Sequence, residues 1–223
     1  MYKINRTVAC IIYYNEMDND NLERCLKSIH NKFNYIVAVD GAYKEFPHDN
    51  FLSTDGSTEL AKKYCSNVII PNREWVDEIE KRNSYLKRLC YGDFVVIIDS
   101  DEEMIGGIDK KELELGDIKD IPECFFYDIR LTRHDNVPPY NIYRAFKYFS
   151  TMGYQGTHNA LWLKHNAFEN EYLTNSIVPR RLITGFHFEH YQDERSKQRV
   201  LDKGIYYRKL WEQEKDYRKK YGL

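Results

Sequence analysis

The sequence lacks several features that would assign a protein to a common class. Its net charge is −2, so there is no basic excess of the kind that general nucleic-acid binders carry. The longest apolar run, residues 8–14, is far too short to span a bilayer. Residues 1–6 are polar, unlike the start of a secretory signal. These absences predict a cytoplasmic protein and leave open a peripheral contact with a membrane.

Cysteine is scarce, and no two cysteines have the CxxC spacing of a metal or redox site. Their number is odd and each lies in an apolar stretch, which indicates reduced, buried side chains and neither a disulfide framework nor a zinc site. The five are Cys10, Cys25, Cys65, Cys90 and Cys124.

Apolar runs and helical repeats alternate along the first half of the chain. Short branched runs predict buried strands, and apolar residues at three- and four-residue spacing predict amphipathic helices. Such alternation is typical of an α/β domain with a mostly parallel sheet and helices on both faces. The strands are expected at residues 7–12, 35–39, 68–70 and 94–98, and the helices at 22–29, 57–64 (with Ser57 as N-cap) and 75–89.

The pattern changes after residue 103. Alternation predicts a half-buried strand at 125–131, and mixed strands are expected at 142–149 and 160–163. From Asp193 onward the chain is charged and helical, with ten basic and six acidic residues. A basic, aromatic helix suits an anionic membrane or a nucleic-acid surface, but packing of its aromatic residues on the domain is the simpler interpretation.

Polar residues follow three of the predicted strands. The first strand leads into Tyr13, Asn15 and Glu16, the second ends at Asp40, and the fourth runs into Asp99-Ser100-Asp101. Ligands of open parallel sheets bind at the carboxyl ends of the strands. The carboxylates of the last triplet suit a hard divalent cation, which also binds phosphate oxygens. The sequence therefore predicts a nucleotide-diphosphate and metal site at this edge.

Three blocks of the first half form a recognisable series. They are 8–29, which includes Tyr14-Asn15-Glu16; Val39-Asp40-Gly41 followed by 53–64; and Lys81-Arg82-Asn83, Gly92-Asp93-Phe94 and Asp99-Ser100-Asp101-Glu102. In this order and at this spacing the three blocks resemble the family 2 glycosyltransferases of GT-A fold, and together they are specific.

The resemblance implies a UDP- or GDP-linked sugar donor and Mn²⁺ or Mg²⁺. It also implies a single GT-A domain over residues 1–223, with a nucleotide-sugar-binding half (1–103), an acceptor-side half (104–192) and a C-terminal helix (193–223). Carried to this sequence, the base and ribose pocket is lined by Tyr13, Asn15, Glu16 and Asp40; Asp99 and Ser100 face the nucleotide; Asp101 is the principal metal ligand; and Arg73 and Lys81 approach the base or diphosphate.

One insertion departs from the family pattern. Residues 43–52 separate Asp40-Gly41 from the Ser-Thr-Asp-Gly turn that usually follows almost directly. The insertion starts at the nucleotide edge, so a lid, a part of the acceptor site and a simple surface loop are all open.

The second half offers histidines and possible bases. The resemblance implies a late histidine at the metal; His187 and His190 are the candidates, on opposite faces of a strand, with His187 slightly preferred. Inversion at the sugar needs a general base near the acceptor hydroxyl. Glu102 and His158 are the main candidates; Glu103 and Asp128 remain open, and Asn159 stands where the family has a glutamate.

Two other functions compete with glycosyl transfer. A sugar nucleotidyltransferase would carry a Gly-rich phosphate loop after the first strand, and this sequence does not. A non-catalytic nucleotide-binding module would bind a donor without turning it over. The acceptor is open among a glycan, a lipid-linked sugar, a protein side chain and a modified nucleic acid.

Overall fold

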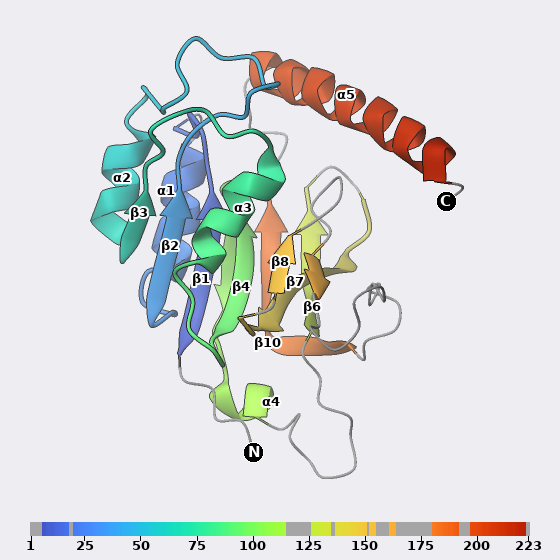
Figure 1. The fold of residues 1–223 in the computed structure, drawn as a ribbon. Helices are drawn as coiled ribbons and strands as arrows, with labels where there is room; N and C mark the ends of the chain where they lie inside the picture. Colours follow the sequence, from blue (N-terminus) through green and yellow to red (C-terminus); the bar gives the residue numbers. More distant parts are fainter. Residues whose placement is uncertain are drawn as a thin grey trace.

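An eight-stranded sheet forms the centre of the computed structural model, which describes residues 6–17, 20–114, 126–134, 137–150, 152–154, 161–163, 180–191 and 197–221. The strand order is β3-β2-β1-β4-β7-β6-β10-β5 (Figure 1). A separate antiparallel pair consists of β8 and β9. The strands are β1 (Thr7–Ile12), β2 (Tyr35–Val39), β3 (Asn67–Ile69), β4 (Phe94–Asp99), β5 (Glu102–Gly106), β6 (Phe126–Arg133), β7 (Tyr140–Lys147), β8 (Met152–Tyr154), β9 (Leu161–Leu163) and β10 (Arg180–His190).

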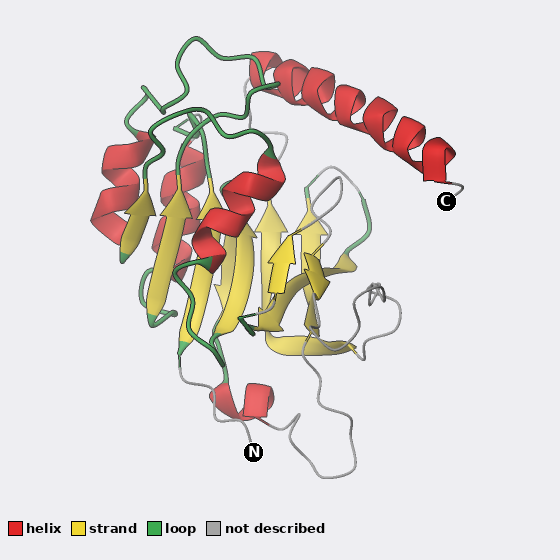
Figure 2. Ribbon diagram, in the orientation of Figure 1, coloured by secondary structure: helices red, strands yellow, loops and turns green. Residues whose placement is uncertain are grey.

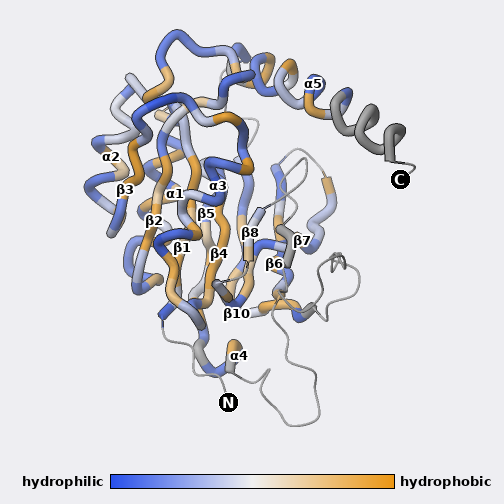
Figure 3. The backbone as a smooth tube through the Cα atoms, in the orientation of Figure 1, coloured by the Kyte–Doolittle hydropathy of each residue, from blue (hydrophilic) through white to orange (hydrophobic). Residues whose placement is uncertain are grey.

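Strands β3, β2, β1 and β4 are parallel, and β2, β1 and β4 are buried between helices on both faces. Cys10 of β1 lies between Val37 of β2 and Ile97 of β4. Side chains alternate across the sheet, so Val8 and Cys10 enter one hydrophobic cluster and Ala9 and Ile11 the other. Figure 3 shows the hydrophobic colour concentrated along these strands. Burial on both faces explains why they read as continuous apolar runs.

The helices divide between the two faces (Figure 2). Helices α1 (Asn21–Ile29) and α2 (Ser57–Tyr64) pack in the cluster that contains Ala9 and Ile11. Helix α3 (Glu78–Leu86) packs in the cluster that contains Val8 and Cys10. A short helix, α4 (Lys110–Glu114), follows β5. The predicted parallel sheet with helices on both faces is therefore confirmed.

Two helix starts differ from the sequence predictions. Gly56, with φ of 95°, caps α2, and Ser57 is its first helical residue; the Ser57 hydroxyl instead accepts a hydrogen bond from the backbone N–H of Glu16 at 2.9 Å. Helix α3 starts only after Asp77, whose carboxylate accepts from the Glu80 N–H at 2.7 Å. Trp75 precedes this cap because its backbone pairs with residues 42–44.

The second half completes the sheet with mixed strands. Strand β7 is antiparallel to both β4 and β6, and β10 is parallel to β6 and antiparallel to β5. Strand β5 was not predicted; it follows β4 directly in the chain but lies at the far edge of the sheet. Because only Ser100 and Asp101 separate β4 from β5, the sheet curls until its β5 edge starts beside the end of β4.

Helix α5 (Lys197–Tyr221) lies over the carboxyl ends of the parallel strands and then extends away from the sheet (Figure 1). It is the longest helix of the described chain. Among the described residues, no helix combines the length and the apolar character needed to cross a membrane.

Candidate functional site

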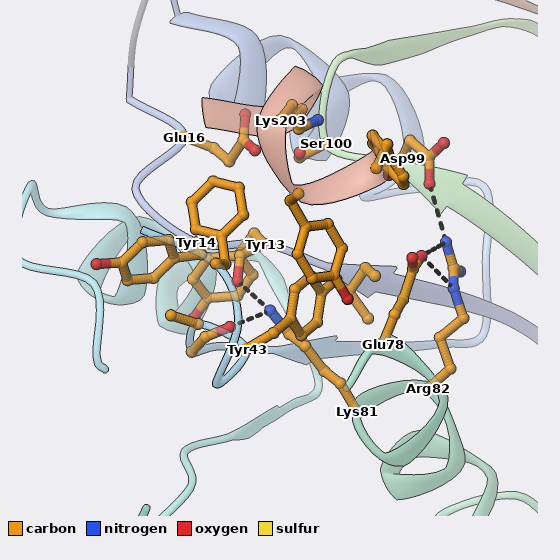
Figure 4. A pocket seen from close by; sticks show the side chains of 16 residues that line it. Tyr13, Tyr14, Glu16, Tyr43, Glu78, Lys81, Arg82, Asp99, Ser100 and Lys203 are labelled. Carbon is orange, nitrogen blue, oxygen red and sulfur yellow. Dashed lines mark hydrogen bonds and ion pairs between the residues drawn. The ribbon is translucent and has the colours of Figure 1, made fainter. Parts of the chain in front are cut away.

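A pocket opens at the carboxyl ends of β1, β2 and β4 (Figure 4). It has a volume of about 640 Å³, counted to its open mouth. Its walls come from the ends of these strands, from the first turns of α3 and from α5. The edge predicted from the sequence therefore does contain an open pocket, at the place where ligands of such sheets bind.

Lys81 ties two of the strand ends together beneath the pocket. Its side chain is buried, and its ammonium donates to the carbonyl oxygens of Tyr13 at 2.6 Å and Gly41 at 2.5 Å. The predicted approach of Lys81 to a diphosphate thus competes with two backbone contacts. The structure places Lys81 in the pocket wall, and its role toward a ligand stays a prediction.

Asp40 organises the turn after β2. Its carboxylate accepts hydrogen bonds from the hydroxyls of Ser53 and Thr58, both at 2.6 Å, and from the backbone N–H groups of Gly41 and Ser53. Gly41 has φ of 107°, and a Cβ there would lie 2.9 Å from both Pro71 and Trp75, so only glycine fits. The Asp40 side chain faces this turn and is not among the pocket-lining residues; its predicted ribose contact stays a prediction.

The residues after β1 divide between the pocket and the neighbouring turn. Tyr13 and Glu16 line the pocket, as predicted for the nucleotide site. Asn15 adopts φ of 48°, a left-handed conformation that asparagine tolerates, and its side-chain oxygen accepts from the Thr54 N–H at 2.8 Å. Asn15 therefore fixes the β1 turn against the β2–α2 turn, and it does not line the pocket.

Asp99 lies between two guanidinium groups. Arg144 Nη2 donates to Asp99 Oδ2 at 2.5 Å, and Arg82 Nη2 lies 3.5 Å from Oδ1. Arg82 is itself held by Glu78, at 2.8 Å. Burial opposes ionisation, but the charge of Arg144 outweighs it and holds the pKa of Asp99 well below its usual range. Asp99 is therefore a permanently ionised residue of the pocket wall.

Glu102 lies behind this pair and is almost fully buried. Its Oε2 accepts from the Asp99 N–H at 2.9 Å, and its Oε1 lies 3.4 Å from Arg144 Nη2. Burial is the main cause that raises the pKa of Glu102 to about 7, against the opposing charge of Arg144. The other candidate base, His158, lies outside the described residues, and Glu103 accepts a hydrogen bond from the Tyr191 hydroxyl at 3.1 Å.

Asp101 turns the other way and meets the end of β10. His190 Nε2 lies 3.0 Å from Asp101 Oδ2, and the Tyr191 N–H donates to the Asp101 carbonyl at 3.0 Å. Burial alone would lower the pKa of His190. Its hydrogen bond to Asp101 and the nearby negative charges raise the pKa by more, so the pKa lies above the ordinary histidine value. His187 lies 3.9 Å from Glu189 and is more exposed. The structure thus brings His190, and not the preferred His187, to Asp101.

The Asp101–His190 pair fits a divalent cation in its chemistry. It offers one oxygen and one imidazole nitrogen, a set that suits Mn²⁺ better than Mg²⁺. The other ring nitrogen of His190, Nδ1, is buried and has no hydrogen-bond partner within the described part of the chain. No group of three or more His, Cys, Asp and Glu side chains suited to a metal occurs among the described residues.

Comparison with known proteins decides the family. Residues 8–168 match the model of glycosyl transferase family 2. The chain belongs to this family. The matched residues run from β1 to β9, and they include all the pocket-lining residues except those of α5. The match confirms the predicted family, the GT-A type of α/β fold and the enzyme class of the domain, glycosyltransferase.

Solved structures show weaker similarity to this family 2 chain. S. aureus TarS is 17% identical over 70% of this chain and 25% of its own, with a TM-score of 0.45. TarS residues 1–349 in complex with UDP are 18% identical over 59% of this chain and 37% of theirs, with a TM-score of 0.44.

A third similar structure is glucosyl-3-phosphoglycerate synthase from Mycobacterium tuberculosis, in complex with Mn²⁺, UDP and glucosyl-3-phosphoglycerate. It is 18% identical over 60% of this chain and 46% of its own, with a TM-score of 0.36. The chain thus spans from a quarter to less than half of the length of these proteins. No curated protein sequence matches it.

The insertion of this family 2 domain supports α5. Tyr206 of α5 is buried against the insertion: its ring stacks on Tyr43 with centroids 5.3 Å apart and meets Phe46 edge-on at 5.9 Å. Tyr14 completes the cluster through an edge contact with Phe46. Packing of the helix on the domain is therefore confirmed, and the insertion provides its platform.

Several site residues escaped the sequence predictions. Arg144 contacts Asp99 from β7, and Lys203, Tyr206 and Tyr207 line the pocket from α5. An arginine inside the otherwise apolar and aromatic run Tyr143-Arg144-Ala145-Phe146 was a usable signal, because a buried cation needs a partner. Arg73, in contrast, was predicted at the site, but it is exposed, pairs with Glu80 at 2.5 Å and does not line the pocket.

Proposed function

We propose that this domain transfers a sugar from a UDP- or GDP-linked donor to an acceptor hydroxyl, assisted by a divalent metal. One observation carries the proposal. The triplet Asp99-Ser100-Asp101 stands at the end of β4 with a pocket on the side of Asp99 and a histidine on the side of Asp101. In a family 2 chain this arrangement offers a nucleotide site and a metal site at adjoining positions.

The pocket suits the nucleotide part of such a donor. Glu16 and Asp99 present carboxylates, which accept hydrogen bonds from ribose hydroxyls or base N–H groups. The arginine partners keep Asp99 ionised at every working pH, so it remains an acceptor. Tyr13 and Tyr14 add aromatic surface at the β1 end of the pocket.

Asp101 and His190 would hold the metal. A bound divalent cation supplies a Lewis acid that neutralises the charge developing on the departing diphosphate. Asp101 is oriented for this role by the Tyr191 N–H on its carbonyl and by β10, which holds His190 3.0 Å from its carboxylate. Metal binding would displace the proton that these two groups share.

We propose inversion at the sugar, with Glu102 or His158 as the base. A pKa of about 7 suits Glu102 to proton transfer near neutral pH. Its Oε2 accepts from the Asp99 N–H, so an acceptor hydroxyl would donate to Oε1, which lies 3.4 Å from Arg144 Nη2. The acceptor itself is a glycan, a lipid-linked sugar, a protein or a modified nucleic acid.

A thermal-unfolding panel tests the donor and the metal together. The chain is heated with UDP, GDP, ADP and their sugar conjugates, each with and without Mn²⁺. We expect one base to raise the unfolding temperature, and only when Mn²⁺ is present, because a ligand of the folded state stabilises it by mass action.

A second measurement distinguishes an enzyme from a binding module. We expect the wild-type chain to hydrolyse the stabilising nucleotide-sugar slowly, and we expect no hydrolysis from Asp101→Asn. The released nucleotide is the quantity measured. Binding without any turnover in the presence or absence of candidate acceptors contradicts the enzymatic proposal, and the absence of binding to every nucleotide contradicts the donor site.

A further inference from the structure

Helix α5 brings a lysine to the wall of the pocket. Lys203 lines the cavity, and in Figure 4 its ammonium lies on the side of Ser100 and Glu16, away from Lys81. Lys203 is partly buried. Within the described part of the chain, no carboxylate lies within ion-pair distance of it, although α5 also carries Lys209, which does pair, with Glu45 at 3.7 Å.

The other cations of the pocket already have protein partners. Lys81 donates to two backbone carbonyl groups, and Arg82 binds Glu78 and Asp99. The pocket also contains the carboxylates of Glu16, Glu78 and Asp99, which repel a phosphate group. A diphosphate in this cavity therefore needs positive charge beyond that of α3, and Lys203 is placed to supply it.

The fold fixes the position of Lys203 through its neighbour one turn later. Tyr206 lies three residues along the same helix face and is buried under α5. Its ring stacks on Tyr43 with centroids 5.3 Å apart and meets Phe46 edge-on at 5.9 Å. This anchor holds the turn that carries Lys203 against the pocket, so binding requires little reordering of the helix.

We propose that Lys203 binds the diphosphate of the nucleotide-sugar donor from α5. The proposal rests on the function proposed above and adds a residue to it. The ammonium of Lys203 then acts as a point charge on the phosphate side of the pocket, next to Ser100, whereas the bound metal acts from the side of Asp101. Residues 8–168 match the family model, so this phosphate contact comes from a part of the chain beyond that match.

The test compares Lys203→Gln with Lys209→Gln, a matched change on the same helix outside the pocket. Isothermal titration with Mn²⁺ measures the affinity for UDP and GDP, and for uridine and guanosine as probes without phosphate. We expect Lys203→Gln to weaken diphosphate binding about 10-fold, the typical effect of losing one charge-assisted hydrogen bond. Nucleoside affinity should change less than about 2-fold, and Lys209→Gln should match the wild type. Lys203→Arg should recover most of the lost affinity.

Three outcomes overturn the assignment. Unchanged diphosphate affinity in Lys203→Gln shows that the ammonium does not contact the phosphates. An equal loss for nucleosides and diphosphates shows a role in pocket shape only, and a lowered unfolding temperature of the variant would accompany it. If the wild-type chain binds no nucleotide, the proposed function fails and the assignment fails with it, whereas the first two outcomes leave that function intact.

Discussion

The two aspartates of one triplet lie in opposite electrostatic settings. Asp99 faces Arg144 and Arg82, and Asp101 faces His190. A guanidinium keeps its charge at any pH that the fold survives, so Asp99 is committed to a permanent ion pair. An imidazole loses its proton near neutral pH and then becomes a metal ligand. The first aspartate is therefore built into the pocket wall, whereas the carboxylate of the second is available to bind a metal.

Removal of the Asp101 carboxylate should have the largest effect, and that effect should be on activity. Asp101→Asn is expected to lower kcat/KM with Mn²⁺ about 1,000-fold, because transition-state stabilisation of several kcal/mol depends on the metal. The free energy of unfolding should fall by only about 1 kcal/mol, since the amide retains an oxygen toward His190. Steady-state kinetics and urea unfolding measure the two effects, and full activity in the variant contradicts a metal role for Asp101.

The same change at Asp99, the carboxylate in the permanent ion pair, should lower the stability of the fold more than Asp101→Asn does. Asp99→Asn leaves Arg144 and Arg82 without their shared partner, so we expect the free energy of unfolding to fall by about 3 kcal/mol. Urea unfolding measures the loss. The double variant Asp99→Asn, Arg144→Gln is the control and should recover part of the stability, because the unpaired cation is then also removed. A single variant as stable as the wild type would remove the distinction between the two aspartates.

The first half of the chain was predictable because its signals are local. Strands buried on both faces show as apolar runs, and the bounds of β1 and β2 agreed with the structure. The start of α3 was not predictable from periodicity, since Trp75 fits a helical face but pairs its backbone with residues 42–44.

The site was less predictable, because its decisive contacts join distant segments. The triplet and the strand-end polar residues were found from their pattern, but no local pattern tells which strand carries the partner of Asp99. The contact of Arg144 follows from the position of β7 beside β4. Likewise, the two histidines at 187 and 190 differ in the strand face that each occupies. Which face of β10 meets Asp101 depends on the tertiary fold.

A pH series sharpens the comparison at His190. Burial lowers its pKa, but the bond to Asp101 and the surrounding negative charge raise it by more. The protonated pair therefore stabilises the fold fully below the ordinary histidine pKa of about 6.5, and this stability is lost as the pH rises through the raised value. Mn²⁺ affinity should rise about 10-fold through the same window, since the metal competes with the proton.

Matched histidine variants identify the source of that pH dependence. His190→Asn should flatten both the stability and the Mn²⁺-affinity profiles, and His187→Asn should leave both as in the wild type. Unfolding and Mn²⁺ titration at several pH values provide the measurement. The reverse result, with His187 controlling the profile, would reinstate the sequence-based preference.

The smallest effect is expected at Arg73. Its side chain is exposed, pairs with Glu80 and donates to the Glu74 carbonyl, so Arg73→Ala should leave the free energy of unfolding almost unchanged. The KM for the donor should not change either. A clear rise in KM would show that a cation outside the pocket wall reaches the diphosphate, and it would weaken the contrast between partnered and available charges.

The insertion at 43–52 and helix α5 have a consequence for how such a chain can vary over evolution. Each covers aromatic surface of the other: Tyr43 and Phe46 on one side, Tyr206 on the other. Deletion of the insertion alone would expose the aromatic face of the helix, and deletion of the helix alone would open one wall of the pocket. The two segments, distant in the gene, are therefore expected to be gained or lost together among relatives.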